Sequence, residues 1–444
     1  CSADKSYRLA TLTRQNIFDD IILRPSYISV ISGKPGTGKT LLALRACIEN
    51  AKRGRNSVYF TFNEDAETIK KKLKELFGFI HEEYIEVKEA ITLGGEGVSA
   101  LTADILSSVG SSSLVVLDSL DALMVGVMSD QERRTLLQSL YRTVKLRNTS
   151  LIMISESEDP YLLAGYAADA YMTIKMNCVE EKVYRYVQIR KARDVPIYYP
   201  NYTFTPYRGF TEIPHLDEIR DIEVERPLAD EHMQLFMKGV RMVVEFDNDV
   251  PYSFINEMKR VFAAYFLDKG HGVMYFTSYD EDGGEVRKRI SKIVSNKNAI
   301  SNLHVMARKE RDVKGDMLAY WSSFYNVRRN IAMDLKRKTK GKTVISIFSL
   351  WFNDLVYSSI REKHVSTIQR FIGFDKKHGV ISIGFTSTGA KVNEVEKRIT
   401  DGYFRFIVKH GRVFAYGEKP CTLLYGVTVN QKEGKWGYEF LPMI

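Results

Sequence analysis

Apolar runs of strand length alternate with amphipathic stretches along the first half of the chain. The β-branched segment "SYISVIS", residues 26–32, reads as a strand. A glycine-rich stretch follows it, and then "LLALRACIENAKR", whose apolar residues have helical spacing. Further strands are predicted at 58–62, which runs into a helix, and at 114–117, which is wholly apolar. The pattern therefore predicts a strand, a glycine loop and a helix in that order.

Length and composition indicate two globular domains. The chain has 444 residues, more than one core usually supports, so two domains of roughly 220 residues each are expected. Hydrophobic residues make up 44% and charged residues 27%, as in ordinary globular proteins. No run of about 18 apolar residues is present, and the first residues are too polar for a signal peptide. We therefore expect a soluble, cytoplasmic protein that does not enter a membrane.

The charge is unevenly distributed. The net charge is +9, and the second half carries the excess of Lys and Arg, most densely in 327–342 and 282–302. A nucleic acid or an acidic protein partner would fit such a surface, and so would a solvated lysine-rich face. The cysteines form no CxxC pair, so isolated thiols are expected rather than a zinc site or a disulfide framework; they are Cys1, Cys47, Cys178 and Cys421.

The glycine-rich stretch "GKPGTGKT" matches the pattern GxxxxGK[ST]. In a strand-to-helix setting, such glycines let backbone N–H groups surround a β-phosphate, and the helix N-terminus adds partial positive charge. Lys39 would reach the β- and γ-phosphates, and the Thr40 hydroxyl would bind Mg²⁺. ATP and Mg²⁺ are therefore the expected ligands. The predicted nucleotide-binding residues are Gly33, Lys34, Pro35, Gly36, Thr37, Gly38, Lys39, Thr40 and Leu41.

Two carboxylates complete the predicted catalytic set with Lys39. Asp118 ends the apolar strand in "LVVLDSLDAL", where a carboxylate can help to hold Mg²⁺. An aspartate that only caps the next turn is the alternative. Glu64 follows the strand at 58–62 and is the best placed group to orient or deprotonate an attacking water, although acidic residues in a first helical turn often serve only the helix dipole.

The ordered segments "FDDII", "GKPGTGKT", "VYFTFNED", "LVVLDSLDAL" and "QIRKARD" together resemble a KaiC-type domain of the RecA-like ATPases, of a sort frequent in archaea. The resemblance covers residues 8 to about 216. In that family the second strand ends in two glutamates, the first acting as the base toward water; Asn63 and Glu64 stand at those places. An asparagine can hold a water but cannot take its proton. The resemblance therefore implies slow ATP hydrolysis through Glu64, or binding without turnover.

Lys191 and Arg193 match a basic pair with which this family reaches a neighbouring subunit's γ-phosphate. The resemblance thus implies a homo-oligomer, ring or filament, whose ATP site a neighbour completes. From the residues alone, the two are cations with period-two spacing on a strand, for which a solvated face is the ordinary reading.

The second half reads as a degenerate copy of the first. At a constant offset of 216, "LDKGHGVMYFTS" aligns with "AKRGRNSVYFTF", so that Tyr275 falls on Tyr59. The same offset places "DVPYSFIN" over the glycine loop, with Asp249 on Gly33 and Asn256 on Thr40. Phe348 falls at the place of Asp118. We predict an α/β protein with two RecA-like domains, each a mostly parallel sheet flanked by helices, at 1–226 and 227–444, the second without nucleotide binding and joined by an acidic linker at 214–232.

Three functions follow as hypotheses. The first is an ATP-binding protein with weak ATPase activity that uses its nucleotide state to control assembly or a partner. The second is a DNA-associated accessory protein resembling recombinase paralogues, motivated by the basic second half. The third, a protein kinase, rests on family analogy alone, and the second active domain it would need is degenerate here.

Overall fold

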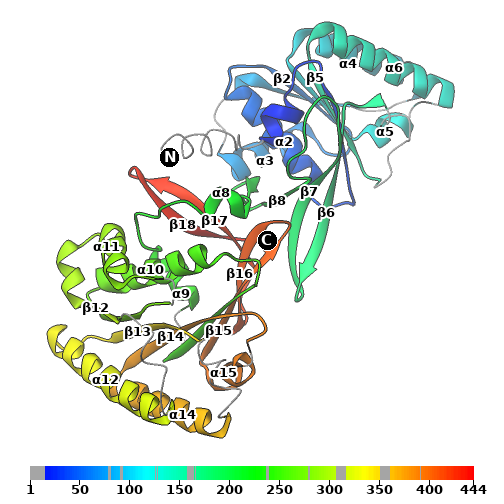
Figure 1. The fold of residues 1–444 in the computed structure, drawn as a ribbon. Coiled ribbons are helices and arrows are strands. Elements are labelled where there is room, and N and C mark those ends of the chain that lie inside the picture. Colours follow the sequence, from blue (N-terminus) through cyan, green and yellow to red (C-terminus); the bar gives the residue numbers. More distant parts are fainter. Residues whose placement is uncertain are drawn as a thin grey trace, which may run out of the picture. The chain divides into compact units, whose positions relative to one another are not determined.

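The chain forms two compact units. The computed structural model describes residues 16–78, 82–90, 94–125, 127, 129–157, 165, 167–236, 240–278, 281–306, 317–350, 361–390 and 392–444. Contacts divide the chain into residues 1–213 with 443–444, the first unit, and 214–442, the second unit. Figure 1 shows the elements of both.

In the first unit, helices and strands alternate as the sequence pattern predicts (Figure 1). The helices are η1 (Phe18–Ile22), α2 (Lys39–Ala51), α3 (Ala66–Phe77), η2 (Glu82–Tyr84), α4 (Gly94–Ser111), α5 (Leu120–Val125) and α6 (Asp130–Arg147). The strands are β1 (Ile28–Ser32), β2 (Ser57–Thr61), β3 (Ile85–Glu89), β4 (Leu114–Asp118), β5 (Ser150–Ser155), β6 (Ala170–Val179), β7 (Lys182–Ala192), β8 (Asn201–Thr205) and β9 (Thr211–Glu212).

The second unit has the same alternation. Its helices are α8 (Leu216–Ile219), α9 (Asp230–Phe236), α10 (Tyr252–Asp268), α11 (Gly283–Ile293), η3 (Lys297–Asn302), α12 (Met317–Lys338), α14 (Arg361–His378) and α15 (Asn393–Ile399). Its strands are β10 (Arg241–Phe246), β11 (Gly272–Phe276), β12 (Leu303–Met306), β13 (Val344–Ser349), β14 (Val380–Ser387), β15 (Gly402–Lys409), β16 (Arg412–Lys419), β17 (Tyr425–Lys432) and β18 (Lys435–Pro442).

Within the described residues, each unit contains one nine-stranded sheet, and the two sheets have the same topology. The first runs β3-β2-β4-β5-β1-β6-β7-β8-β9, and the second runs β12-β11-β13-β14-β10-β15-β16-β17-β18. In both, the first six strands in this order are parallel and the rest are antiparallel. The predicted α/β class with two RecA-like folds is confirmed.

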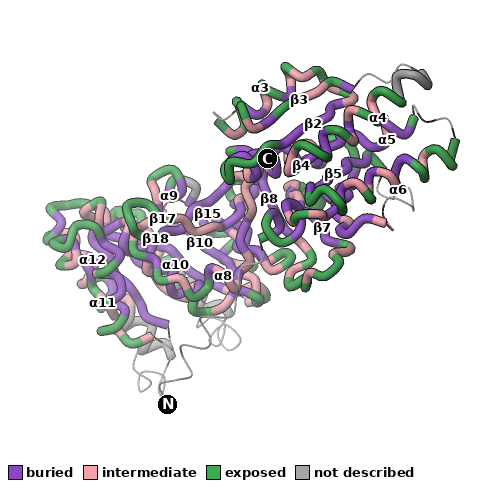
Figure 2. The backbone as a smooth tube through the Cα atoms, turned by 90° about the horizontal axis from the view of Figure 1, so that it is seen from above, coloured by how far each residue is buried: buried purple, intermediate pink, exposed green. Residues whose placement is uncertain are grey.

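The first unit is a three-layer sandwich because its parallel strands are apolar on both faces. Tyr59 and Val116 pack with residues of α2 and α3 on one face, whereas Phe60 and Leu117 pack with residues of α4, α5 and α6 on the other. Side chains of successive strand residues point to opposite faces, which produces this division. Figure 2 shows buried strands between helices that are exposed on their outer sides.

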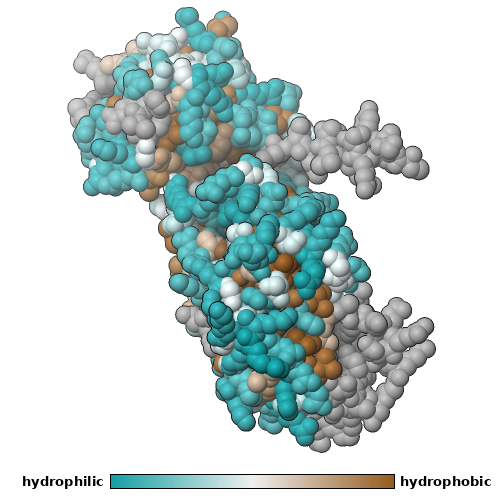
Figure 3. Space-filling view, turned by 90° about the vertical axis from the view of Figure 1, so that its left-hand side faces the viewer, coloured by the Kyte–Doolittle hydropathy of each residue, from teal (hydrophilic) through white to brown (hydrophobic). Residues whose placement is uncertain are grey.

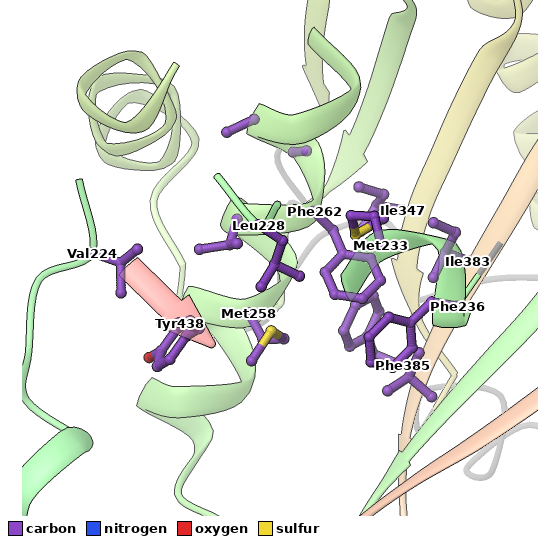
Figure 4. Close-up of a cluster of buried hydrophobic side chains, with 14 of the residues drawn as sticks. Val224, Leu228, Met233, Phe236, Met258, Phe262, Ile347, Ile383, Phe385 and Tyr438 are labelled. Atoms are coloured by element: carbon purple, nitrogen blue, oxygen red, sulfur yellow. The ribbon is translucent and has the colours of Figure 1, made fainter. Parts of the chain in front are cut away.

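The second unit repeats these layers with an aromatic core. Residues of α10 and α11 cover one face of its sheet, and residues of α12 and α14 cover the other. Phe236 of α9 packs edge-on against Phe262 of α10 at 5.2 Å between ring centroids, beside Phe385 of β14 (Figure 4). Such aromatic pairs add about 0.5–1.5 kcal/mol each beyond their buried area.

The described contacts place the division between the units earlier than the predicted boundary at 226. Leu216, Ile219 and Val224 are buried in the core of the second unit, and Val224 lies beside Tyr438 in Figure 4. The acidic segment 214–232, predicted as a linker, therefore contributes apolar side chains to that core. Its charged residues alternate with these buried ones, which hides the pattern at the sequence level.

Among the described residues, no helix combines the length and apolarity needed to cross a bilayer. The face in Figure 3 is largely hydrophilic, with smaller apolar patches. Of the four cysteines, Cys47 is buried and Cys178 and Cys421 are exposed free thiols, while Cys1 lies outside the described residues.

Candidate functional site

The glycine loop connects β1 to α2, and two of its glycines are required by close packing. Gly33 has φ 150°, and a Cβ there would lie 2.6 Å from the carbonyl oxygen of Ile174 in β6. Gly38 has φ 109°, and a Cβ there would lie 3.2 Å from the Phe204 ring. Side chains at either position would strain the loop, because L-residues rarely adopt positive φ. The loop is thus a backbone surface at the carboxyl end of β1.

Lys39 begins α2 and turns back over this loop. Its Nζ donates to the carbonyl oxygens of Gly33 at 2.7 Å and Lys34 at 3.0 Å, and the residue is 8% exposed. Burial lowers the pKa of the Lys39 ammonium, and nearby carboxylates, Glu156 foremost, act in the opposite direction. An anion bound against the loop would interact with the Lys39 ammonium and would offset the cost of burying that charge.

Thr40 and Asp118 meet across the sheet. The Thr40 hydroxyl donates to Asp118 Oδ2 at 2.8 Å, and the Tyr59 hydroxyl donates to the same oxygen at 2.5 Å. Burial raises the pKa of Asp118, while these hydrogen bonds lower it in part. Sequence reasoning did not identify Tyr59, although its recurrence as Tyr275 in the second half was an available signal.

These oxygens fit a magnesium ion. Thr40 and Asp118 offer a hydroxyl and a carboxylate, the hard ligands that Mg²⁺ takes, and the glycine loop lies beside them. Among the described residues, no three His, Cys, Asp or Glu side chains gather as a closed metal site. Mg²⁺ commonly uses one or two protein ligands and completes its shell with phosphate and water.

The other predicted loop residues surround the same backbone. Thr37 is buried, and its hydroxyl donates to the Lys34 carbonyl at 2.8 Å. Leu41 packs against the core of the first unit. The residues exposed along the loop are Lys34, Pro35 and Gly36. The structure therefore brings all nine predicted nucleotide-binding residues to one end of β1.

Glu64 lies near Asp118 but is engaged in an ion pair. Its two carboxylate oxygens accept hydrogen bonds from Lys72 of α3 at 2.6 and 2.5 Å. The neighbouring Asn63 donates its side-chain amide to Glu156 Oε1 at 3.3 Å. Glu156 follows β5 and was not among the predicted site residues. The role of Glu64 as the base stays a prediction.

Lys191 and Arg193 lie near the amino ends of β1 and β6, whereas the glycine loop lies at the carboxyl end of β1. Lys191 Nζ donates to the carbonyl oxygen of Ala168 at 2.6 Å, just before β6 begins. Arg193 lies one residue beyond β7, and its backbone carbonyl accepts from the Tyr27 hydroxyl, just before β1. The pair is therefore not two cations along one strand. Its location excludes contact with the loop of its own unit, and the predicted role toward a neighbour is untested.

Strand pairing in the second unit corrects two predicted correspondences at the degenerate site. The N–H of Asp169 donates to the carbonyl oxygen of Ile28, and the N–H of Asp401 donates to that of Arg241. These equivalent contacts align β10 with β1 and place Phe246 at the position of Gly33. Asp249 is therefore not its equivalent. By the same alignment, Gly36, Thr37 and Gly38 correspond to Asp249, Val250 and Pro251, which precede α10. The connection at 247–251 therefore contains no glycine.

The second correction concerns the metal strand. The ladders β5–β4 and β14–β13 pair Ile154 with Asp118 and Phe385 with Ser349. Since β14 aligns with β5 through their shared pairing with the central strand, Ser349, and not Phe348, replaces Asp118. A serine keeps the polar position but removes the charge that would hold Mg²⁺.

A buried ammonium occupies this degenerate site. Lys259 of α10 is 0% exposed, and its Nζ contacts Ser278 Oγ at 2.9 Å, Glu281 Oε2 at 3.1 Å and Ser349 Oγ at 3.3 Å. Burial by itself raises the pKa of Glu281, but Lys259 and the other partners of the carboxylate outweigh it and hold the pKa below its usual value. In the second unit, the ion pair of Lys259 with Glu281 therefore occupies the place that corresponds to the metal site of the first unit.

The basic segment 327–342 forms the end of α12 and the turn before β13. Lys336 Nζ donates to the His378 carbonyl at 2.5 Å, and Lys342 Nζ donates to the Lys269 carbonyl at 2.9 Å. These two cations tie neighbouring turns of the second unit together. Nucleic-acid binding by this segment stays a prediction.

Comparison with known proteins finds similarity in the part of the chain that carries the glycine loop and its partners. Residues 13–213 match the family model described as the KaiC ATPase. The chain is 25% identical over 224 residues to the circadian clock protein KaiC3 of Synechocystis sp.. That alignment covers 46% of this chain and 44% of the relative, so the chain spans less than half of the length of the curated relative it matches.

A solved structure of a KaiC-like protein from the archaeon Pyrococcus horikoshii is also similar. It is 20% identical and aligns with 43% of this chain and 90% of its own, with a TM-score of 0.38. The sheet topology described above establishes the fold. With the family match over the first unit, the glycine loop and the Thr40–Asp118 pair lead to one conclusion. Residues 13–213 are similar to the KaiC ATPase family and have a RecA-like fold with a phosphate-binding type of glycine loop.

Proposed function

We propose that the protein binds one MgATP per chain in its first unit and hydrolyses it slowly, using the nucleotide state to control assembly or a partner. The observation that carries this proposal is the 2.8 Å hydrogen bond from Thr40 to Asp118 beside the glycine loop. In this arrangement, loop N–H groups and Lys39 bind the phosphates, while Thr40 and Asp118 hold Mg²⁺. When bound, Mg²⁺ would neutralise part of the negative charge of the phosphates.

The second unit is proposed to bind no nucleotide. Phe246 replaces the first loop glycine, and the ion pair of Lys259 with Glu281 fills the space beside Ser349. Equilibrium titration of the purified chain with MgATP tests the proposal. A stoichiometry of one is expected; two per chain, or no binding by folded protein, would contradict it.

The same titration with Asp118→Asn is expected to separate metal from phosphate contacts. Without Mg²⁺, variant and wild type should bind ATP alike, because the loop and Lys39 are unchanged. With Mg²⁺, the wild type should bind at least ~10-fold more tightly than the variant, since Asp118 helps to hold the ion. Asp104→Asn, at an exposed ion pair with Lys88, is the matched control and should behave as wild type.

Assembly is proposed to depend on the basic pair. Lys191 and Arg193 lie away from their own glycine loop, and their proposed role is to complete the site of another copy. We expect the solution mass to rise when MgATP is added, and Lys191→Ala with Arg193→Ala to lose that response. Lys52→Ala with Arg55→Ala removes the same charge beside β2 and should keep it. Mass photometry or light scattering measures this; an ATP-independent monomer would refute the assigned role.

A further inference from the structure

The end of β5 carries a carboxylate in the middle of the proposed ATP site. β5 pairs with β1 on one side and with β4 on the other. Its carboxyl end therefore lies between the strand that leads into the glycine loop and the strand that ends in Asp118. Glu156 is the first residue after β5. A side chain at this position can reach the space beyond the bound phosphates.

Neighbouring groups fix the backbone of Glu156. Its N–H donates to Asp121 Oδ2 at 2.5 Å, and the hydroxyl of Ser155 donates to Asp121 Oδ1 at 3.2 Å. Asp121 lies in the first turn of α5, which follows Asp118 closely. The start of the segment after β5 is therefore tied to the loop that carries the metal-binding aspartate.

The carboxylate itself lies near enough to the catalytic lysine to influence its pKa. Of the charged groups that stabilise the Lys39 ammonium, Glu156 has the largest effect, ahead of Asp118 and Asp121. Among the described residues, the Asn63 side-chain amide donates a hydrogen bond to the Glu156 carboxylate at 3.3 Å. The group is exposed and held by a neutral donor, so it stays available as a proton acceptor.

Glu64 is less suitable for the same task. Both of its oxygens accept from the Lys72 ammonium, so the carboxylate is already engaged in an ion pair. Asn63 cannot accept a proton but can fix a water or a carboxylate through its amide. Asn63 and Glu64, in the segment after β2, thus leave the base to be supplied by the end of another strand.

We propose that Glu156 is the general base of the ATP hydrolysis proposed above, with Asn63 as the residue that positions it. The water oxygen bonds to the γ-phosphorus while the bond from that phosphorus to the β,γ-bridging oxygen breaks. The Glu156 carboxylate takes the water's proton, and the bridging oxygen keeps the electron pair as ADP leaves. Inorganic phosphate is the second product. This inference rests on the proposed function of the first unit.

Glu156→Gln tests the assignment because it removes the base and keeps the shape. We expect kcat for MgATP to fall by ~10²-fold or more, while the dissociation constant for MgATP changes by less than about threefold. Glu64→Gln is the matched comparison and should lower kcat far less.

A swap of the hydrogen-bonded pair gives a second, independent test. Asn63→Glu combined with Glu156→Gln exchanges the carboxylate and the amide but keeps their contact. We expect this double variant to recover at least ~10-fold of the turnover lost in Glu156→Gln, which a purely structural role would not produce.

The outcomes separate the two proposals. If the chain binds MgATP but Glu156→Gln turns over as fast as the wild type, or if Glu64→Gln alone abolishes turnover, the assignment of the base is overturned and the proposed function stands. If folded wild-type protein does not bind MgATP, the proposed function falls and takes this inference with it.

Discussion

Lys39→Ala is expected to abolish MgATP turnover and to weaken nucleotide binding, with kcat/KM reduced by at least ~10³-fold. The ammonium is buried at the mouth of the glycine loop, where burial lowers its pKa and two carbonyl oxygens accept its hydrogen bonds. A phosphate bound there would receive a positive charge at low desolvation cost. Lys39→Met keeps most of the aliphatic stem and should have the same effect, so lost charge is separated from lost packing.

The control for this prediction lies at the other end of the same helix. Lys52 caps α2 at its C-terminus and pairs with Glu49, far from the loop. Lys52→Ala should therefore keep wild-type binding and turnover. Thermal melting of each variant checks folding, and MgATP should raise the midpoint of the wild type and of Lys52→Ala only. Unchanged MgATP affinity in folded Lys39→Met would contradict the assigned role of the ammonium.

The local parts of this site could be read from the sequence, because each depends on neighbours along the chain. The glycine loop needs a strand before it and a helix after it, and the structure gives both, at β1 and α2. Asp118 follows four apolar residues and ends β4 as predicted. The repeat offset that aligned Tyr275 with Tyr59 also aligned β11 with β2, so the second RecA-like fold was predictable.

The long-range parts could not be read in this way. Glu156, Asn63 and Lys39 come from connections after three different strands and meet only because the sheet order is β2-β4-β5-β1. No local spacing encodes that order. The ion pair of Lys72 with Glu64 likewise depends on how α3 lies after β2. Sequence reasoning therefore named the correct edge of the sheet but not the carboxylate that is least engaged there.

The corrections in the second unit have a common physical cause. A shift of one residue along a strand moves every side chain to the other face, so Phe348 and Ser349 have opposite environments although they are neighbours. Only the ladder to β14 distinguishes them. Met242 falls on Ser29 and Val273 on Ser57, so the second unit has three more residues between its first two aligned strands, and a constant offset misplaced Asp249. Strand ends, where the chemistry of this fold lies, are the positions that a sequence pattern locates least well.

The second large effect is expected from Lys259→Ala, which should lower the free energy of unfolding of the second unit by about 3–5 kcal/mol. The ammonium is 0% exposed, and the side chain of its partner Glu281 is 1% exposed. Removing the Lys259 ammonium leaves the Glu281 carboxylate buried with less neutralising charge. Among the described ion pairs, only the one with Arg260, at 2.9 Å, still neutralises it. Denaturation of the full chain, followed by circular dichroism, measures the loss. The transition that MgATP does not shift is assigned to the second unit.

A double variant distinguishes the lost ion pair from lost packing. In Lys259→Met with Glu281→Gln, neither charge of the pair is buried, so we expect most of the lost stability to return. Lys269→Ala, which breaks an exposed pair with Asp230 in the same unit, should leave the unfolding midpoint almost unchanged. Since the ion pair lies outside the first unit, Lys259→Ala should keep wild-type MgATP binding. Wild-type stability in Lys259→Met alone would show that the ammonium does not support the degenerate site, and its position beside Ser349 would need another explanation.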